Sequence, residues 1–171
     1  MHKLYSILIA MLVLVVFAPL AVAKPPFWDD QVNSPGRFKV LSEFGGAAVF
    51  DKETGLVWEQ SPNGVDERTW ANARFHCANK NVGGRKGWRL PSFAELASLV
   101  DPNNPGGNPD LPPGHPFDNV QSSIYWSATT FADGAGDAWT VLFNDGNVSA
   151  SGKTFSQFVW CVRGGMNADA Y

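Results

Sequence analysis

The 171-residue chain carries a formal net charge of −3, with 17% charged and 44% hydrophobic residues. This acidic balance argues against nucleic acid as a partner, because proteins that bind nucleic acid usually show a strong basic excess or a basic patch. Seven Trp and twelve Phe residues supply enough large apolar surface to build a hydrophobic core.

The first 23 residues predict a cleavable secretory signal peptide. Lys3 precedes an apolar run over residues 7–17, Pro19 interrupts the run, and Ala21-Val22-Ala23 matches the small-x-small pattern that signal peptidase reads. An uncleaved membrane anchor is the alternative, but the proline and the small residues favour cleavage. We therefore expect an exported chain, periplasmic or extracellular. No second long apolar stretch follows, so no membrane span is expected in the mature chain.

Residues 24–37 are rich in proline and polar residues and are interpreted as a linker. We expect one domain over residues 38–165 and a flexible tail over residues 166–171. The first predicted element is a β-hairpin, because apolar runs at 47–50 and 56–60 flank a turn that ends in glycine.

A first helix is predicted to begin after Thr69 and to run to about Ala78. Helical spacing places Cys77 on the same face as Trp70 and Ala73. Because this face is largely apolar, we expect it to point inward and to bury Cys77.

A second helix is predicted to begin after Ser92. Glu95 stands three positions later, and the two residues form the pattern of a capping box. Residues 101–116, with six prolines and three glycines, cannot form a regular element and are expected to be a surface loop.

The chain then turns to β-structure. Strands are predicted at 124–128, 138–143 and 158–163, with a hairpin turn at 144–147 that returns over 147–149. Strands, two helices and further strands in this order predict an α+β domain. Five tryptophans stand at strand or helix spacing among apolar residues and are expected in the core: Trp58, Trp70, Trp126, Trp139 and Trp160.

The chain has two cysteines, Cys77 and Cys161. In an exported protein the default expectation for two cysteines is a disulfide. Two free thiols or a metal pair remain as alternatives. A metal site would need further ligands, and the mature chain offers only His76 and His115 as additional histidines.

Four segments, taken in order, resemble one bacterial family, the Legionella collagen-like protein C-terminal domain, which is a domain of unknown function. The resemblance covers roughly residues 38–164 and implies an exported protein, often with a role at the cell surface. The segments are Asp51-x-x-Thr54-Gly55-Leu56-Val57-Trp58, Gly87-Trp88-Arg89-Leu90-Pro91 with Glu95-Leu96, Tyr125-Trp126-Ser127-Ala128-Thr129 and Trp160-Cys161-Val162-Arg163.

A looser resemblance connects the chain to C-type lectin-like folds. The helix pattern Thr69-Trp70-x-x-Ala73-x-x-x-Cys77 and the terminal Trp160-Cys161 are similar to the helix and strand that such folds join by a disulfide. The segment Arg89-Leu90-Pro91-x-x-x-Glu95 also resembles a motif of formylglycine-generating enzymes, which share the fold. The resemblance implies an α+β, C-type lectin-like domain with two helices packed on small antiparallel sheets.

These resemblances imply two functional classes. True C-type lectins hold calcium through a triplet that follows the central strand, whereas Asn108-Pro109-Asp110 precedes Tyr125-Trp126, so we expect no metal site. Formylglycine-generating enzymes rely on two active-site cysteines, but both cysteines here stand where the structural disulfide of the fold would be. We expect no catalytic residue and no cofactor. An oxidoreductase of the formylglycine-generating or sulfatase-modifying type is kept as the alternative.

Two groups of residues are candidate ligand contacts. Arg85 and Lys86, with Arg89 beside them, form a basic stretch that could hold an anionic polysaccharide, unless the stretch is a solvated loop or one Arg pairs with a core carboxylate. His115 and Phe117 end the proline-rich loop, and ligands are commonly met by loops on a rigid scaffold. The sequence thus predicts an exported, non-enzymatic binding module of the cell envelope, with a glycan or an envelope protein as partner. It predicts no oligomeric state.

Overall fold

A computed structural model of the chain describes residues 36–62, 66–101, 104 and 108–165. The predicted signal peptide (1–23), the predicted linker up to residue 35 and the predicted tail (166–171) lie outside the described residues.

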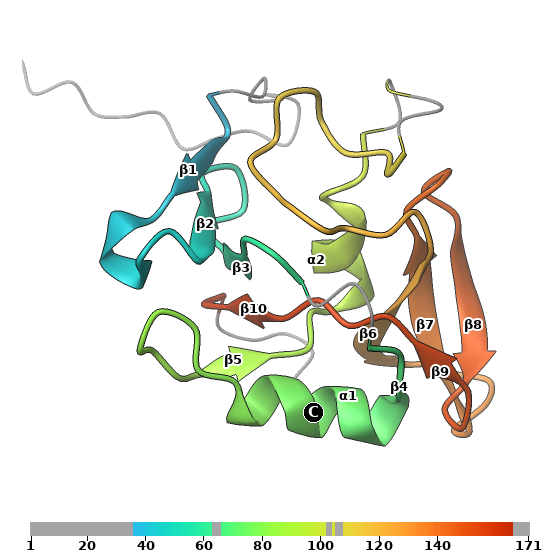
Figure 1. Ribbon diagram of the computed structural model, residues 1–171. Coiled ribbons are helices and arrows are strands. Elements are labelled where there is room, and N and C mark those ends of the chain that lie inside the picture. Colours follow the sequence, from blue (N-terminus) through green and yellow to red (C-terminus); the bar gives the residue numbers. More distant parts are fainter. Residues whose placement is uncertain (1–35, 63–65, 102–103, 105–107, 166–171) are drawn as a thin grey trace, which may run out of the picture.

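Within the described residues, two α-helices pack against three antiparallel sheets, with α1 at the edge of the molecule (Figure 1). The largest sheet has the strand order β1-β2-β3-β10-β5, a three-stranded sheet has the order β6-β7-β8, and β4 pairs with β9. The elements are β1 (Phe38–Val40), the 3-10 helix η1 (Ser42–Phe44), β2 (Ala48–Asp51), β3 (Val57–Glu59), β4 (Arg68–Thr69), α1 (Trp70–Asn79), β5 (Trp88–Arg89), α2 (Phe93–Ala97), β6 (Ile124–Thr130), β7 (Asp137–Leu142), β8 (Val148–Gly152), β9 (Ser156–Gln157) and β10 (Val162–Arg163).

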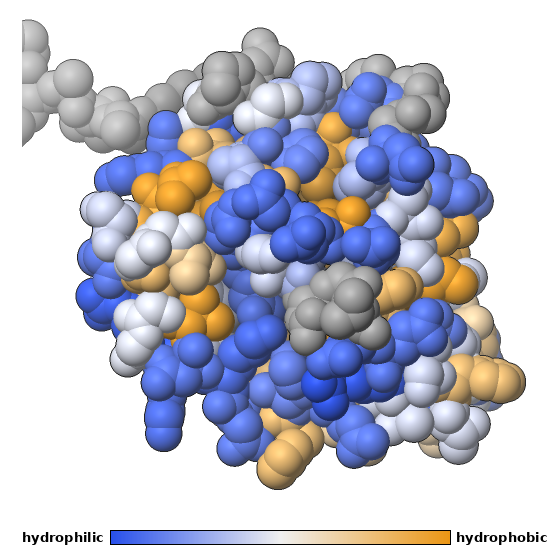
Figure 2. Space-filling model, viewed as in Figure 1, coloured by the Kyte–Doolittle hydropathy of each residue, from blue (hydrophilic) through white to orange (hydrophobic). Residues whose placement is uncertain are grey.

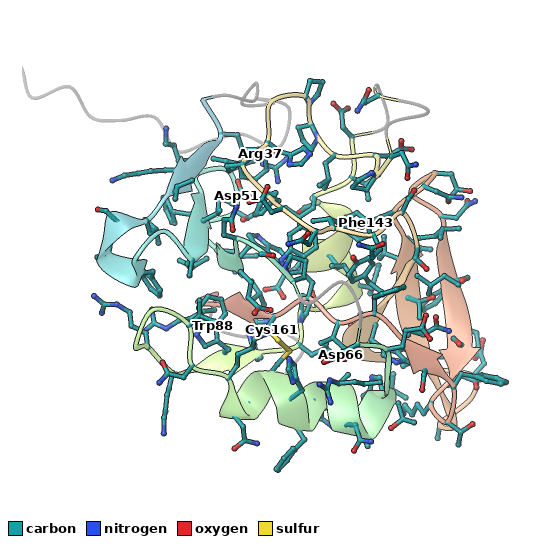
Figure 3. The ribbon with its side chains drawn as sticks, viewed as in Figure 1. Arg37, Asp51, Asp66, Trp88, Phe143 and Cys161 are labelled. Atoms are coloured by element: carbon teal, nitrogen blue, oxygen red, sulfur yellow. A yellow bond between two sulfur atoms is a disulfide. The ribbon has the colours of Figure 1, made fainter. Side chains whose placement is uncertain are left out.

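The predicted first hairpin is confirmed as β2 and β3, with Val49 opposite Trp58. The turn is held by Asp51, whose carboxylate accepts hydrogen bonds from the Thr54 hydroxyl and the Glu53 backbone N–H. Both oxygens of Asp51 also accept from the buried Arg37 guanidinium, at 2.9 and 2.8 Å (Figure 3). Because Arg37 also donates to the carbonyl of Ser98, it joins this hairpin to the end of α2.

Helix α1 packs against β5 and β6, follows β4 directly and is joined by a disulfide to Cys161, just before β10 (Figure 1). Ala73 and Cys77, four positions apart, are its buried residues, as the predicted inward face requires. Cys77 is bonded to Cys161, with the Cα atoms 5.4 Å apart (Figure 3). The predicted disulfide is therefore confirmed, and the described residues hold no free cysteine.

Helix α2 begins as the capping box predicts. The Ser92 hydroxyl accepts from the Glu95 N–H, and the Glu95 carboxylate accepts from the Ser92 N–H. The same carboxylate pairs with both terminal nitrogens of Arg89, at 2.7 and 2.6 Å. One Arg of the basic stretch is thus paired with a carboxylate, although Glu95 is partly exposed and does not lie in the core.

The strands after the proline-rich loop form a meander, as predicted, but the last predicted strand is wrong as a single element. The segment 158–163 divides between two sheets: the backbone of Phe158 bonds to β6, and the backbone of Cys161 bonds to β3. Only Val162 and Arg163 then form β10, between β3 and β5. Residues 158–162 are all apolar because this part of the segment crosses the core between the sheets.

The core consists of two packed clusters of buried residues. Three of the five tryptophans predicted in the core are fully buried: Trp58, Trp126 and Trp160. The prediction is wrong for Trp70 and Trp139, which are only half-buried. The proline-rich loop is also less superficial than predicted, because Asp110 and Leu111 are buried and Leu111 packs in the core.

The α+β class and the packing of two helices on small antiparallel sheets are confirmed. The finer assignment to the C-type lectin-like fold stays a prediction. In the part of the chain that the structure describes, no helix is long and apolar enough to cross a membrane.

Candidate functional site

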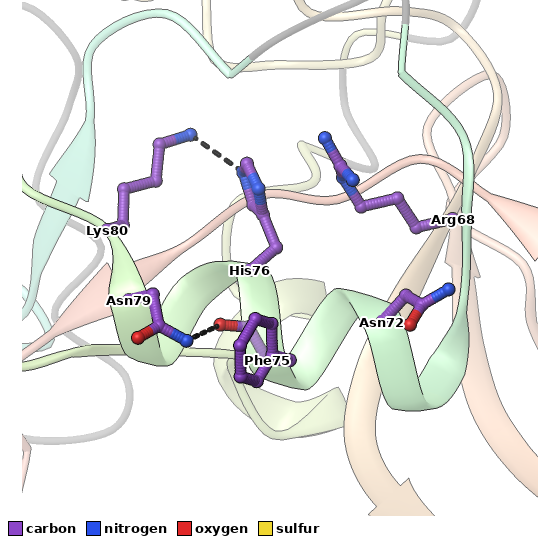
Figure 4. A pocket seen from close by; sticks show the side chains of 6 residues that line it. All are labelled: Arg68, Asn72, Phe75, His76, Asn79 and Lys80. Atoms are coloured by element: carbon purple, nitrogen blue, oxygen red, sulfur yellow. Dashed lines mark hydrogen bonds between the residues drawn. The ribbon is translucent and has the colours of Figure 1, made fainter.

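A pocket of about 350 Å³ opens along the outer side of α1 (Figure 4). This volume lies in the range of ~300–1,000 Å³ that is usual for small-molecule sites. Hydrophilic side chains cover most of the molecular face that carries α1 (Figure 2). The pocket is lined by Arg68, Asn72, Phe75, His76, Asn79 and Lys80.

Helical geometry explains why these side chains meet. Residues three or four positions apart share one side of a helix, so 72, 75, 76, 79 and the C-cap residue 80 form one stripe. Ala73 and Cys77 lie on the neighbouring side of the helix, which turns toward the core, and are buried. Arg68 comes from β4, which is held by its pairing with β9 and leads directly into α1.

A buried ion pair supports one end of the pocket. Lys80 Nζ lies 2.5 Å from Glu59 Oε1, and the side chain of Glu59 is only 3% exposed. The other oxygen of Glu59 accepts a hydrogen bond of 2.9 Å from the backbone N–H of Cys161, beside the disulfide. Burial raises the pKa of Glu59, although the charge of Lys80 opposes this effect.

His76 stands between Lys80 and Arg68 on the wall of the pocket (Figure 4). Its Nε2 lies 3.1 Å from Lys80 Nζ. Burial, followed by the charges of Lys80 and Arg68, lowers the pKa of His76 to about 4, so the ring is neutral at pH 7. Because an ammonium group can only donate, Nε2 accepts and the ring proton lies on Nδ1. His76 therefore offers one N–H donor.

Arg68 brings a further donor to the pocket. Its terminal nitrogen pairs with Asp66 at 3.1 Å, and both side chains of this pair are about one-third or more exposed (33% and 47%). Among the described residues, the buried Nε of Arg68 has no hydrogen-bond partner. The pocket thus presents N–H donors and the ring of Phe75, which is 72% exposed. Such a lining suits a small ligand that carries acceptor oxygens.

The predicted contacts His115 and Phe117 lie elsewhere. Phe117 is 5% exposed, and its ring packs against Trp160 and Phe38. His115 is half-buried and stacks on Phe117, with burial lowering its pKa. Phe117 is thus a core residue in this structure, because the loop turns its ring inward, and only His115 of this group lies near the surface.

The predicted contacts Arg85 and Lys86 are exposed on the turn before β5. The guanidinium of Arg85 lies 4.9 Å from the centre of the Phe44 ring, and the guanidinium of Arg163 lies 6.0 Å from the same ring. This basic turn does not line the α1 pocket. His115 and Phe117 do not line it either, so neither predicted group of ligand contacts belongs to the pocket.

Sequence reasoning missed the pocket itself. The spacing of His76 and Lys80 on a predicted helix was a usable signal, because positions i and i+4 share one face. Glu59 and Arg68 gave no such signal, since their places beside α1 depend on the sheet pairings of β3 and β4.

The Asn108-Pro109-Asp110 triplet is built into the fold through its backbone. Asp110 donates its N–H to the carbonyl of Phe143 and accepts from the N–H of Asp101. In the described ranges, no three His, Cys, Asp or Glu side chains are grouped so that they could hold a metal ion.

The comparisons with known proteins agree with the motif evidence. The family described as the Lcl C-terminal domain, in which Lcl denotes the Legionella collagen-like protein, matches residues 47–163. This match covers more than half of the chain, and the chain belongs to this family. A search of curated proteins found no match.

Proposed function

We propose that this chain is an exported, non-enzymatic binding module of the bacterial cell envelope, which contacts a glycan or an envelope protein through the α1 pocket. The signal-peptide pattern of the first 23 residues supports export. The observation that carries the binding role is the pocket itself, whose lining includes Arg68, His76 and the exposed ring of Phe75.

The scaffold suits recognition of a ligand. The disulfide fixes α1 to the sheet through Cys77, and the Glu59–Lys80 ion pair fixes the end of the helix. Rigid placement of the contacting side chains lowers the entropy that binding would otherwise cost. The disulfide also argues against the formylglycine-generating alternative, because both sulfur atoms are bonded and neither is a thiolate.

Co-sedimentation of the mature chain with isolated cell envelopes tests this proposal. We expect the wild-type chain to sediment with the envelopes, and Phe75→Ala combined with Asn72→Ala to weaken this binding about tenfold, which corresponds to ~1.4 kcal/mol. Phe155→Ala is the matched control, because Phe155 is 64% exposed and does not line the pocket. Protease treatment of the envelopes distinguishes a glycan, whose binding survives, from a protein.

Equal sedimentation of the wild-type chain and the pocket variant would contradict the proposed site. Failure of the folded wild-type chain to sediment at all would contradict the binding role at the envelope. Both variants change exposed side chains, so their melting temperatures should stay close to that of the wild type.

A further inference from the structure

We propose that two copies of the chain pair through the outer edge of β8, antiparallel and about a two-fold axis beside Ala150, so that their three-stranded sheets join into one. Figure 1 shows β8 at the outer side of its sheet. The inference goes beyond the proposed function, because no residue of β8 lines the α1 pocket.

The backbone of β8 alternates between groups that face β7 and groups that face outward. The two strands pair without a register shift. At the ends of their ladder, the N–H of Leu142 donates to the carbonyl of Asn147, and the N–H of Lys153 donates to the carbonyl of Gly136. Hydrogen-bonded pairs alternate along an antiparallel ladder, so residues 149 and 151 turn their N–H and C=O groups toward β7. Residues 148, 150 and 152 therefore turn theirs outward.

These outward groups form an open edge. In the part of the chain that the structure describes, the carbonyl of Gly152 is the one outward group with a backbone partner, the N–H of Phe155. The side chains of β8 are also accessible, since Val148, Ser149 and Ala150 are all exposed. A row of free donors and acceptors along an edge is a template for another strand.

The other sheet edges among the described residues are protected in ways that β8 lacks. The outer strands of the five-stranded sheet are short, with three residues in β1 and two in β5, and each carries a cation, Lys39 or Arg89. Strands β4 and β9 have only two residues each. The far side of β6 is covered, because Trp126 donates its N–H to the carbonyl of Phe158. Strand β8 has five residues, and none of them is charged or a proline.

The sequence of β8 suits pairing with a second β8. A two-fold axis beside Ala150 places Ala150 opposite its own copy, Val148 opposite Gly152 and Ser149 opposite Ser151. The hydrogen-bonded pairs are then those of residues 148, 150 and 152, whose groups face outward. The carbonyl of Gly152 keeps a second lone pair for this ladder.

The side chains agree with this register. Opposed serines can share a hydrogen bond, and a branched valine faces a glycine, so neither like charges nor two large side chains meet. Val148, whose side chain is 40% exposed, would be covered in part. This self-complementarity favours a second copy over an unrelated strand as the occupant of the edge.

Pairing would change how the domain binds a surface. A dimer carries two α1 pockets, and joined sites bind a repeating surface more tightly than separate sites, without any new contact. This consequence rests on the proposed function, whereas the pairing itself does not.

Analytical ultracentrifugation of the mature chain over a range of concentrations tests the pairing. Two short strands bury less surface than the ~1,200–2,000 Å² of a stable interface, so we expect a weak, concentration-dependent dimer. Amide hydrogen exchange on the same samples locates the contact. The N–H groups of Val148, Ala150 and Gly152 should gain protection as the concentration rises, whereas β7 already protects those of Ser149 and Ser151.

Charge substitutions at Ala150 test the two-fold register. Ala150→Lys places like charges opposite each other, so it should weaken the dimer at least about tenfold, and Ala150→Glu should do the same. An equal mixture of the two variants should restore pairing, because a cation then faces an anion. Ala78→Lys, at an exposed position of α1, is the matched control and should dimerise like the wild type.

Ala150→Pro tests the backbone of the edge. The N–H of Ala150 points away from β7, so a proline there removes no hydrogen bond of the single chain. We expect a folded monomer that melts close to the wild-type temperature. If the proline variant does not fold, the two charge variants still decide the question, because they change only an exposed side chain.

A wild-type chain that stays monomeric at every concentration would overturn the inference. A dimer that persists in Ala150→Lys, or one whose outward amides gain no protection, would overturn it as well, because the copies would then associate elsewhere. Failure of the mixed variants to pair would overturn the two-fold register. The envelope sedimentation assay tests the proposed function separately from all of these outcomes.

Discussion

Lys80 and Glu59 form an ion pair that joins the C-cap of α1 to the end of β3, directly beside the disulfide. The pair lies between the protein core and the pocket, because Glu59 also accepts from the backbone of Cys161 while Lys80 contacts His76. The stability of the domain and the geometry of the pocket are thus connected through the same two side chains.

Replacing Lys80 by Met should lower the free energy of unfolding by about 3 kcal/mol at pH 7, because a buried carboxylate then loses its cation. Without Lys80, burial raises the pKa of Glu59 further above its usual 4.5. The loss should therefore shrink as the pH falls towards 4.5, where the unfolded state also binds the proton. Urea unfolding at several pH values measures this. The exposed Lys86→Met is the control and should change stability by less than about 0.5 kcal/mol.

Replacing His76 by Gln should flatten the dependence of stability on pH. The pKa of His76 is lowered from 6.5 to about 4, so between these values the unfolded chain binds a proton that the folded chain does not bind. This contribution is fully present above pH 6.5 and is lost as the pH falls towards 4. A slope identical to that of the wild type would contradict the assignment. Burial lowers the pKa of His115 as well, so some slope should remain.

Replacing both cysteines by Ala should lower the free energy of unfolding by a few kcal/mol. The disulfide closes a loop across a sequence separation of 84, for which loss of chain entropy in the unfolded state gives roughly 4–5 kcal/mol. In the denatured, unreduced wild-type chain a thiol-reactive dye should label neither residue. Ready labelling of the folded protein, with unchanged stability of the double variant, would contradict a structural disulfide.

Calcium should leave the thermal stability unchanged. The triplet that resembles a lectin calcium motif stands before the central strand, and Asp110 within it is buried among core contacts. Melting curves with millimolar calcium and with a chelator should coincide, because a ligand of the native state raises stability only if it binds. A rise of several degrees with calcium would show a site in the proline-rich loop.

The elements that the sequence predicts well are those with local causes. The capping box of Ser92 and Glu95 lies within four residues, and the hairpin turn after Asp51 is held by its own side chain. The inward face of α1 follows from helical spacing alone.

The elements that were missed depend on partners far away in the sequence. Strand β4 forms because Arg68 pairs with Gln157 of β9. Strand β10 lies between β3 and β5 because the chain leaves β6 after Phe158. The pocket was missed for the same reason, since its supporting ion pair joins a strand to a helix. Phe117 was expected at the surface because a proline-rich segment indicates a loop, but loop composition does not tell which side chains turn inward.

The intact mass of the protein purified from its native host, without reduction, tests the central claim of an exported domain with a structural disulfide. The account predicts a chain that begins at Lys24 and is lighter by two hydrogen atoms than the reduced form, because both cysteines are bonded. A chain that still begins at Met1, or one whose mass shows two free thiols, would contradict it.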